Sequence, residues 1–170
     1  DSETDDKKII NITVEEKPTG EISAGAGVGT GGASLGFSVK ENNYLGKGVK
    51  LNSTLNLDAD SVKGGVAVTV PNYNYSDNSL IATVESSTED YLTDYGYKTS
   101  KTGFSVGTSF EQYKDLYFSP SVSLYAESLS TDSKASQNLK KQEGSYSDLF
   151  FDYALTYDKR DQSYQTTEGY

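Results

Sequence analysis

Strict alternation between apolar and small or polar residues runs along most of the chain. Residues 33–39, for example, read Ala33-Ser-Leu-Gly-Phe-Ser-Val39. A period of two places successive side chains on opposite faces of an extended strand, and no stretch shows the three- or four-residue spacing of a helix convincingly. The pattern predicts an all-β fold with eight strands after residue 19, namely 20–29, 33–41, 47–58, 62–71, 78–88, 98–111, 115–129 and 144–158.

Short connections join these predicted strands, which indicates an antiparallel meander in which each strand pairs with its neighbours in sequence. The two longest connections, residues 89–97 and 130–143, follow the fifth and the seventh predicted strand. Both therefore emerge at the same edge of the meander. Short turns at one edge and longer loops at the other are typical of outer-membrane β-barrels.

Two kinds of fold produce such alternation. A soluble meander or sandwich packs its apolar face into a core, whereas a transmembrane barrel turns that face to lipid and lines its inside with small and polar residues. Only 34% of the residues are hydrophobic, which is little for a globular core, and the polar face is rich in Gly, Ser and Thr. These features favour the barrel, with the soluble meander as the alternative. Tyrosines near strand ends fit an interfacial aromatic belt: Tyr44, Tyr91, Tyr113, Tyr117 and Tyr157.

The composition excludes several functional classes. The chain has no Cys and no His, which rules out a thiol nucleophile, a Ser-His-Asp triad, a disulfide framework and a Cys/His zinc site. Fifteen Lys and Arg against 25 Asp and Glu give a net charge of −10, which argues against nucleic-acid binding. The glycine motif at residues 27–32 leads into a strand, not into the helix that a dinucleotide site needs. We therefore expect no enzyme, no catalytic residue, no metal and no cofactor.

Targeting and membrane-spanning signals of the helical kind are missing from the sequence. The first eight residues, Asp1-Ser-Glu-Thr-Asp-Asp-Lys-Lys8, do not resemble a signal peptide. No window approaches the run of about 18 apolar residues that a transmembrane helix requires. A membrane role is thus expected only through strands.

Several local motifs resemble those of the Omp85 family. Glu16-Lys-Pro-Thr-Gly20 leads into the first predicted strand, and Glu41-Asn-Asn-Tyr-Leu-Gly46 falls at the first turn. Pro71-Asn-Tyr73 with the polar stretch to Asp77 resembles the next turn of the same edge, and residues 157–169 resemble a further one. In that last motif the family commonly has a proline where this chain has Thr166. The likeness runs from about residue 8 to the end of the chain.

The resemblance implies a domain organisation and a location. Residues 1–18 would hold the end of a periplasmic POTRA domain, with its last strand at 8–17, and a linker. Residues 19–170 would form the N-terminal part of an Omp85-type barrel, corresponding to the first eight of sixteen strands. The expected location is the outer membrane of a Gram-negative cell, with the N-terminal end in the periplasm.

By the same resemblance, the expected function is the assembly and insertion of outer-membrane β-barrel proteins. The implied partners are unfolded outer-membrane proteins, outer-membrane lipids and the lipoproteins of an assembly machinery, with no nucleic acid. Two alternatives stay open: another Omp85-type pore that translocates polypeptides, and a soluble β-meander binding module.

The family's mechanism implies a lateral gate at the first strand, where an incoming protein adds strands by pairing. Four of the ten residues of that strand are glycine, and glycine weakens a strand and specifies its register loosely. An alternative explanation is that the glycines fit a crowded barrel interior. The predicted gate residues are Gly20, Glu21, Ile22, Ser23, Ala24, Gly25, Ala26, Gly27, Val28 and Gly29.

Overall fold

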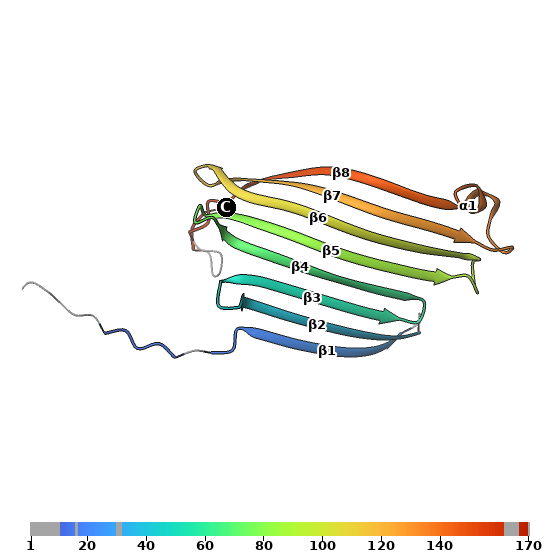
Figure 1. The fold of residues 1–170 in the computed structure, drawn as a ribbon, viewed down its shortest axis with the longest axis horizontal. Coiled ribbons are helices and arrows are strands. Elements are labelled where there is room, and N and C mark those ends of the chain that lie inside the picture. Colours follow the sequence, from blue (N-terminus) through green and yellow to red (C-terminus); the bar gives the residue numbers. More distant parts are fainter. Residues whose placement is uncertain (1–10, 16, 30–31, 162–166, 170) are drawn as a thin grey trace, which may run out of the picture.

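A single antiparallel β-sheet forms almost the whole of the structure, a computed structural model that describes residues 11–15, 17–29, 32–161 and 167–169. Its eight strands lie side by side in sequence order, so the predicted all-β meander is confirmed (Figure 1). Among the described residues, one short helix, α1, lies in the connection that joins β7 to β8. The elements are β1 Gly20–Gly29, β2 Gly32–Tyr44, β3 Val49–Asp58, β4 Ser61–Tyr73, β5 Asn78–Tyr91, β6 Tyr97–Tyr113, β7 Leu116–Thr131, α1 Gln137–Lys141 and β8 Gly144–Tyr157.

The predicted strands match the observed ones, and the differences lie at strand ends. β2 continues to Tyr44 and β4 continues to Tyr73, each past a shift of register that lets the ladder resume beyond polar residues. Such bulges insert extra residues without ending the pairing, and alternation alone does not reveal them. The N-terminal residues 11–15 and 17–19 belong to no strand of this sheet. Residues 8–10 and 16 of the predicted POTRA strand 8–17 lie outside the described residues, as do residues 1–7.

Cross-strand pairing sorts the side chains into two faces. Ile22 lies opposite Val39, and Ala24 lies opposite Phe37, while Gly25 lies opposite Gly36 on the other side of the sheet. We call the two sides the apolar face and the polar face. The apolar face carries an unbroken band that includes Leu35, Phe37, Leu55, Leu57, Val62, Val66, Val84, Phe104, Val106, Val122, Leu124, Leu149, Phe151 and Leu155.

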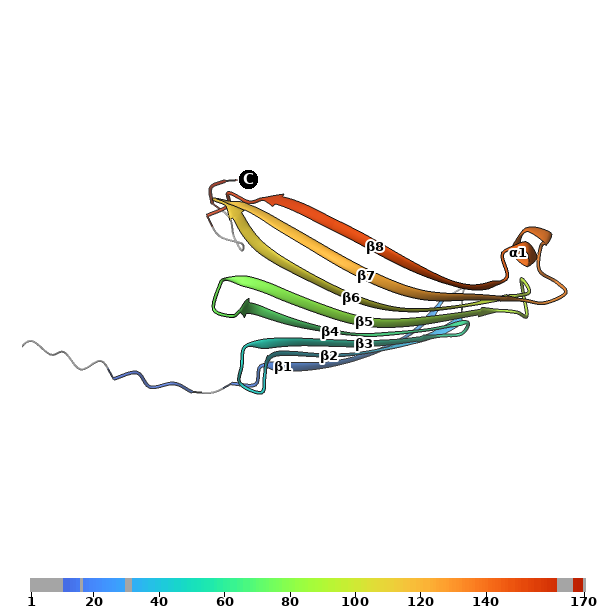
Figure 2. The ribbon, with the colours of Figure 1, turned by 45° about the horizontal axis from the view of Figure 1, so that its top comes forward.

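No second layer covers the apolar face within the described part of the chain. The sheet is one bent layer (Figure 2), and Phe151 remains 74% exposed. The one buried apolar side chain among the described residues, Ala135, lies in a loop and not on the sheet. A soluble sandwich would need a packed core on this face. An uncovered apolar band opposite a polar face is instead what a membrane-spanning barrel wall presents.

Two turns at one edge of the sheet share the same construction. In the β2–β3 turn, the Asn43 Oδ1 accepts the Gly48 N–H at 2.6 Å, and in the β4–β5 turn the Asn72 Oδ1 accepts the Asp77 N–H at 3.1 Å. Both predicted turn motifs are therefore turns, each closed by an asparagine five residues before its end. Residues with positive φ occupy equal offsets in the two turns: Leu45, Gly46 and Gly48 in the first, and Asn74, Tyr75 and Asp77 in the second.

The opposite edge carries the two long connections, as predicted, and they dock on each other. The Asp132 N–H donates to the Gly96 carbonyl at 2.8 Å, and the Lys134 Nζ donates to the Thr93 carbonyl at 2.8 Å. The helix α1 begins after Ser136, whose Oγ accepts the Leu139 N–H at 3.3 Å. Five residues are too few for a helical period to show in the sequence, so α1 is a short addition to the predicted all-β meander.

The predicted aromatic belt needs correction at two positions. Tyr91 lies on the polar side, like Glu89 two residues before it, and pairs with Tyr97; the two ring centroids are 5.4 Å apart and the rings are tilted by 49°. Tyr117 also faces the polar side, opposite Thr156. Tyr157 lies on the apolar face, as an interfacial residue should. Closeness to a strand end was read correctly, but alternate residues of a strand face opposite sides. Tyr91 and Tyr117 each stand seven residues from an apolar-face residue of the same strand, Val84 and Leu124, and so face the other side.

Candidate functional site

The predicted gate strand β1 is an edge strand whose ladder joins it to β2 alone. Its ten residues pair in unbroken register, from Gly20 opposite Glu41 to Gly29 opposite Gly32. Every one of them is exposed, and Val28 reaches 89%. The structure therefore brings all ten predicted gate residues together on one open edge, which presents unpaired backbone N–H and C=O groups along its outer side.

The glycines of β1 divide into two kinds when the space around each is considered. A Cβ added at Gly25 or at Gly29 would meet no atom within 4 Å, whereas one at Gly27 would lie 3.1 Å from the Ser34 Oγ and one at Gly20 would lie 2.8 Å from the Glu41 Oε2. A side chain at Gly20 would thus require the flexible Glu41 carboxylate to move, and one at Gly27 would require a small shift of Ser34. Crowding does not account for Gly25 or Gly29, where the effect of glycine is to weaken the strand.

Side chains of β1 and β2 pair mainly on the apolar face of the sheet. On the apolar face, small and medium residues meet β2, as in the Ala26–Leu35 pair. On the polar face, Gly25 faces Gly36 and Gly29 faces Gly32, so these positions have no cross-strand side-chain contact. Cross-strand pairs each contribute roughly 0.2–1 kcal/mol relative to alanine pairs. Residues 25–29 of β1 are therefore held to β2 more by backbone hydrogen bonds than by contacts between side chains.

The polar face of the sheet is hollowed and charged. Recesses of about 340 Å³ and about 510 Å³ lie over β1–β6 and include Asn56 and Lys63 in their walls. The Lys63 Nζ forms an ion pair with the Glu89 Oε1 at 2.7 Å. The ammonium of Lys101 lies 4.3 Å from the centre of the Tyr125 ring, a cation–π contact. Such a surface suits the water-facing inside of a barrel.

The Tyr125 ring also covers the part of the polar face that is most buried, around Gly103. A Cβ at Gly103 would lie 2.3 Å from the Tyr125 Cε1, so the ring lies directly over the Gly103 backbone. Phe150 packs edge-on against the same ring with centroids 5.8 Å apart. Gly103 and the nearby Ser123 are buried, although each belongs to the polar face. The sheet therefore bends so that side chains crowd on this side.

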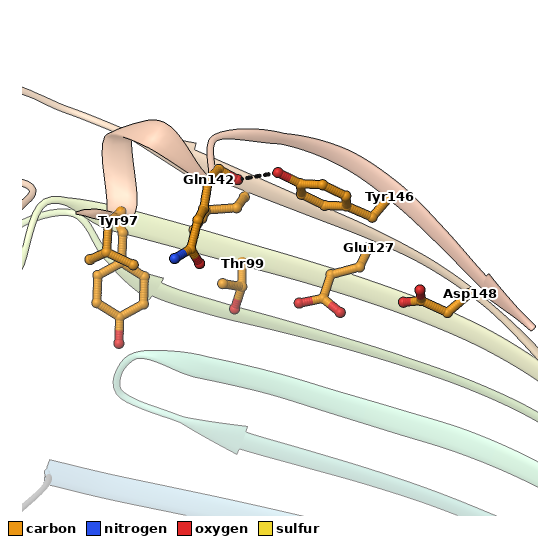
Figure 3. Close-up of a pocket in the computed structure, with 8 residues that line it drawn as sticks. Tyr97, Thr99, Glu127, Gln142, Tyr146 and Asp148 are labelled. Carbon is orange, nitrogen blue, oxygen red and sulfur yellow. Dashed lines mark hydrogen bonds between the residues drawn. The ribbon is translucent and has the colours of Figure 1, made fainter. Parts of the chain in front are cut away.

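A larger recess lies at the loop edge, beneath α1 (Figure 3). It measures about 600 Å³ and is lined by tyrosines and carboxylates that include Tyr97, Glu127 and Asp148. The Tyr146 hydroxyl donates a hydrogen bond of 2.6 Å to the Gln142 carbonyl and ties the start of β8 to the end of α1. Sequence reasoning missed this recess, because its walls come from β6, β7, β8 and the connection that contains α1.

The turn region after β8 holds one strongly perturbed carboxyl. Both Asp158 oxygens accept hydrogen bonds from the Arg160 guanidinium, at 2.7 and 2.6 Å, and the Arg160 N–H adds a third bond at 3.1 Å. The side-chain bonds, followed by the backbone bond, lower the pKa of Asp158 to about 2. Residues 162–166 of the predicted turn motif 157–169, Thr166 among them, lie outside the described residues.

Two further observations bear on the expected chemistry. Across residues 11–15, 17–29, 32–161 and 167–169, no three acidic, His or Cys side chains gather closely enough to hold a metal ion. The same part of the chain has no helix with the length and apolar character to span a membrane.

The fold and its two faces define the class: part of the wall of a transmembrane β-barrel, open at both edges within the described residues. The sequence model of the Omp85 superfamily domain matches residues 43–170, most of the chain. The chain therefore belongs to the Omp85 superfamily, a family of outer-membrane proteins.

A solved structure shares this arrangement of strands. The crystal structure of BamA from Haemophilus ducreyi lacking POTRA domains 1–3 superposes with a TM-score of 0.64 at 20% sequence identity. The match covers 91% of this chain and 33% of the solved chain. The chain thus spans about one third of that protein's solved length, and its sheet corresponds to a portion of a BamA barrel.

Proposed function

We propose that this chain is the first half of the barrel of an insertase that assembles outer-membrane β-barrel proteins. The observation that carries the proposal is β1, an exposed edge strand of an Omp85 sheet in which Gly25 and Gly29 have no steric reason to be glycine. An incoming strand can add to the open edge through backbone hydrogen bonds. Weak side-chain pairing lets that edge exchange partners at low cost.

The implied surroundings follow from the family. The partners would be unfolded outer-membrane proteins, outer-membrane lipids along the apolar face and the lipoproteins of an assembly machinery. The protein would lie in the outer membrane of a Gram-negative cell. Its N-terminal end and the short turns at Asn43 and Asn72 would face the periplasm. Residues 1–18 would belong to a POTRA domain and linker. The action would be physical, through strand pairing, with no enzymatic step and no cofactor.

Insertion by the full-length protein in proteoliposomes tests the proposal. A urea-unfolded outer-membrane protein is added, and its folded fraction is measured over time by protease protection. Gly25→Val adds a β-branched residue in open space, so we expect it to stiffen β1 and slow insertion several-fold. Gly27→Val should act in the same direction with an added contact to Ser34. Equal rates for Gly25→Val and the unaltered protein would refute the gate role.

Gly64→Val in β4 serves as the matched control. Gly64 lies in an internal strand, and a Cβ there would make ordinary contacts at 3.5 Å. It should leave the insertion rate unchanged, because β4 is paired on both sides. A loss of rate as large as that of Gly25→Val would mean that stiffening any strand is harmful and would remove the special role of β1.

A polypeptide-translocating pore is the second candidate, and the hollowed, charged polar face favours it. The same proteoliposomes distinguish the two functions. An inserted substrate is shortened by external protease to a membrane-protected core, whereas a translocated substrate is recovered intact from the vesicle lumen.

A further inference from the structure

Toward the loop edge, the side of strands β5–β8 that carries the apolar band changes from apolar residues to hydroxyl residues. Val84 and Phe104 stand opposite each other in the apolar band, and the next pair on the same side toward α1 is Ser86 and Thr102. We call six residues of this region the hydroxyl patch. They are Ser86, Thr88, Ser100, Thr102, Ser128 and Ser145, and each is at least partly exposed.

The hydroxyl patch crosses four strands without interruption. Thr88 stands opposite Ser100, Ser100 opposite Ser128, and Ser128 opposite Ser145. The row therefore places one hydroxyl on each of β5, β6, β7 and β8 at the spacing of neighbouring strands. On the other side of the row, Thr88 pairs with Val62 of β4, where the apolar band continues to the loop edge.

Two pairs of hydroxyls within the patch are hydrogen-bonded to each other. The Ser86 Oγ lies 3.0 Å from the Thr102 Oγ1, and the Thr88 Oγ1 lies 2.9 Å from the Ser100 Oγ. A hydroxyl has one donor and two acceptor sites, so a bonded pair still has one O–H and several lone pairs to offer. Both pairs can therefore bind a polar group that approaches from outside the sheet.

Strand length places the patch where the wall leaves the hydrocarbon layer. Strand β6 has 17 residues, whereas the edge strand β1 has 10. A tilted strand crosses the hydrocarbon layer in about 9–11 residues. Counted from Phe110, the last aromatic residue on the apolar side of β6, a crossing of about that length ends between Thr102 and Ser100. The patch is therefore level with the lipid headgroups at the loop edge.

The two boundaries of the apolar band differ in aromatic content. Toward the short turns, Phe110 and Phe118 have ring centroids 5.7 Å apart, and Phe118 and Tyr153 have centroids 6.4 Å apart. Toward the loops, Tyr91 and Tyr97 lie on the polar side, and the described strands β5–β8 carry no aromatic residue on the apolar side beyond the band. Aromatic girdles normally mark both headgroup layers of a barrel. The boundary at the loop edge thus has a different chemistry.

The charges near the patch are balanced. Beyond the apolar band, the described strands β5–β8 carry two charged side chains on this side, and these form an ion pair in which the Lys98 Nζ lies 2.9 Å from the Asp90 Oδ2. Phosphate groups are held best by cationic side chains that are free to bind them. The patch instead offers neutral donors and acceptors, which are complementary to the hydroxyls of a sugar.

We propose that the hydroxyl patch binds the uncharged sugar headgroup of a glycolipid. The apolar band beside it contacts the acyl chains of the same lipid, so the two surfaces are continuous parts of one lipid-binding face. By the orientation proposed above, the loop edge faces the cell exterior and the patch meets the outer leaflet. The proposal goes beyond the insertase function and depends only on the membrane position of the sheet.

Native mass spectrometry of the full-length protein tests this proposal. The protein is kept in a detergent without a sugar headgroup and mixed with equal amounts of digalactosyl diacylglycerol and phosphatidylcholine of matched acyl chains. We expect the protein to retain the galactolipid in several-fold excess. Equal retention of the two lipids would overturn the proposal. Stronger retention of phosphatidylglycerol than of the galactolipid, in a parallel mixture, would also overturn it.

Removing both hydroxyl pairs shows whether the galactolipid binds at the patch. Thr→Val keeps the shape of the side chain, and replacing both partners of each pair leaves no hydroxyl without its partner. The excess of galactolipid should fall several-fold, toward equal retention. An unchanged excess would refute the patch as the site. The combined variant is Ser86→Ala, Thr88→Val, Ser100→Ala and Thr102→Val.

A matched control makes the same kinds of substitution on the polar face of the same two strands. It changes one Ser and one Thr in β5 and one Ser and one Thr in β6, as the patch variant does. It should retain the full excess of galactolipid. An equal fall in both variants would assign the effect to the sheet as a whole and contradict the proposal. The control variant is Thr83→Val, Ser87→Ala, Thr99→Val and Ser105→Ala.

An exchanged variant separates the hydroxyls from the packing of the side chains. It keeps four hydroxyl groups on the patch, so it should keep the preference for the galactolipid, and a loss of preference would show that the hydroxyls do not set the binding. Heat-dependent mobility in gel electrophoresis shows that each barrel is folded. The exchanged variant is Ser86→Thr, Thr88→Ser, Ser100→Thr and Thr102→Ser.

Urea unfolding in vesicles provides a second measurement. Adding digalactosyl diacylglycerol to phosphatidylcholine vesicles should raise the urea midpoint of the unaltered protein and leave that of the patch variant unchanged. If the patch faced acyl chains, the patch variant would be the more stable protein in both kinds of vesicle, and the proposal would be wrong. No substrate protein is present, so normal insertion by Gly25→Val would refute the insertase gate without affecting this result.

Discussion

Gly25 lies directly opposite Gly36 in the β1–β2 ladder, so the middle of this strand pair has no side chain on the polar face. A Cβ at Gly25 would meet nothing within 4 Å, whereas one at Gly36 would lie 3.2 Å from the Asn56 Oδ1. A side chain at Gly36 would thus crowd Asn56, whereas a side chain at Gly25 would not crowd any described atom. A substitution at Gly25 can therefore change the stability of the β1–β2 pairing without a steric clash.

Gly25→Val should strengthen the β1–β2 pairing by roughly 0.5–1 kcal/mol, the cost that glycine imposes within a strand. The measurement is amide exchange at residues 24–27 in the folded full-length protein, where protection should rise. Gly64→Val provides the comparison and should leave β1 unaffected. Unchanged protection at 24–27 would show that backbone pairing alone sets the stability of this edge.

Because adjacent residues of β4 lie on opposite faces, we predict that the same substitution has different effects on stability at Val66 and at Ala67. Val66 lies on the apolar face opposite Val84, and Ala67 lies on the polar face opposite Thr83. Val66→Arg should destabilise the protein in a bilayer by about 2–4 kcal/mol, because a charge on the lipid face near the midplane is costly. Ala67→Arg should cost far less. Urea titration of the folded full-length protein in lipid vesicles measures both.

If the soluble meander were correct, neither face would meet lipid. The two arginine variants would then differ little between detergent-solubilised and vesicle-embedded samples.

The docked loops at the α1 edge depend on glycine at position 96. Gly96 has a φ of +75°, and a Cβ there would lie 2.3 Å from the Asp132 Oδ1 and 2.5 Å from the Ala135 N. Gly96→Ala should undock residues 132–143 at a cost of about 1–3 kcal/mol, detected as faster proteolysis within that loop.

Gly46→Ala is the control for the loop prediction. Gly46 has a φ of +69°, but a Cβ there meets nothing within 4 Å. It carries the backbone cost without the clash and should leave the rate of cleavage in residues 132–143 unchanged. Equal cleavage in the two variants would show that the positive φ, not the contact with Asp132, matters.

The Asp158–Arg160 pair predicts a pH dependence whose sign follows from the lowered pKa. The native pKa of about 2 lies below the ordinary value of 3.8, chiefly because the Arg160 side chain donates to the ionised carboxylate. The pair therefore contributes its full stabilisation above pH 3.8 and loses it as the pH falls toward 2. The group is exposed to solvent, so the energy involved is small.

A carbon-13 NMR titration of the aspartate carboxyls measures this pKa. Arg160→Ala should raise the pKa of Asp158 toward 3.8. Arg160→Lys should give an intermediate value, since an ammonium keeps the charge but loses the forked pair of bonds. A midpoint that does not move in Arg160→Ala would contradict the pairing.

The sequence by itself determined the elements that depend on neighbouring residues. Alternation is a local property, so the eight strands and the composition of the two faces follow from it, as the Val66–Ala67 contrast illustrates. The turns closed by Asn43 and Asn72 lie within six residues and were visible as motifs. The resemblance to eight of sixteen barrel strands implied a sheet with open edges, and the glycine content of β1 indicated a weak strand.

Only the tertiary structure decided what depends on register and on distant contacts. Bulges moved the ends of β2 and β4, and no nearest-neighbour pattern encodes them. The Thr19 hydroxyl donates to the Glu41 carboxylate, and the Asp132 N–H donates to the Gly96 carbonyl, each across more than twenty residues. Such contacts form only once the whole sheet has set which residues lie side by side, because a strand specifies its own two faces but not its partner's alignment.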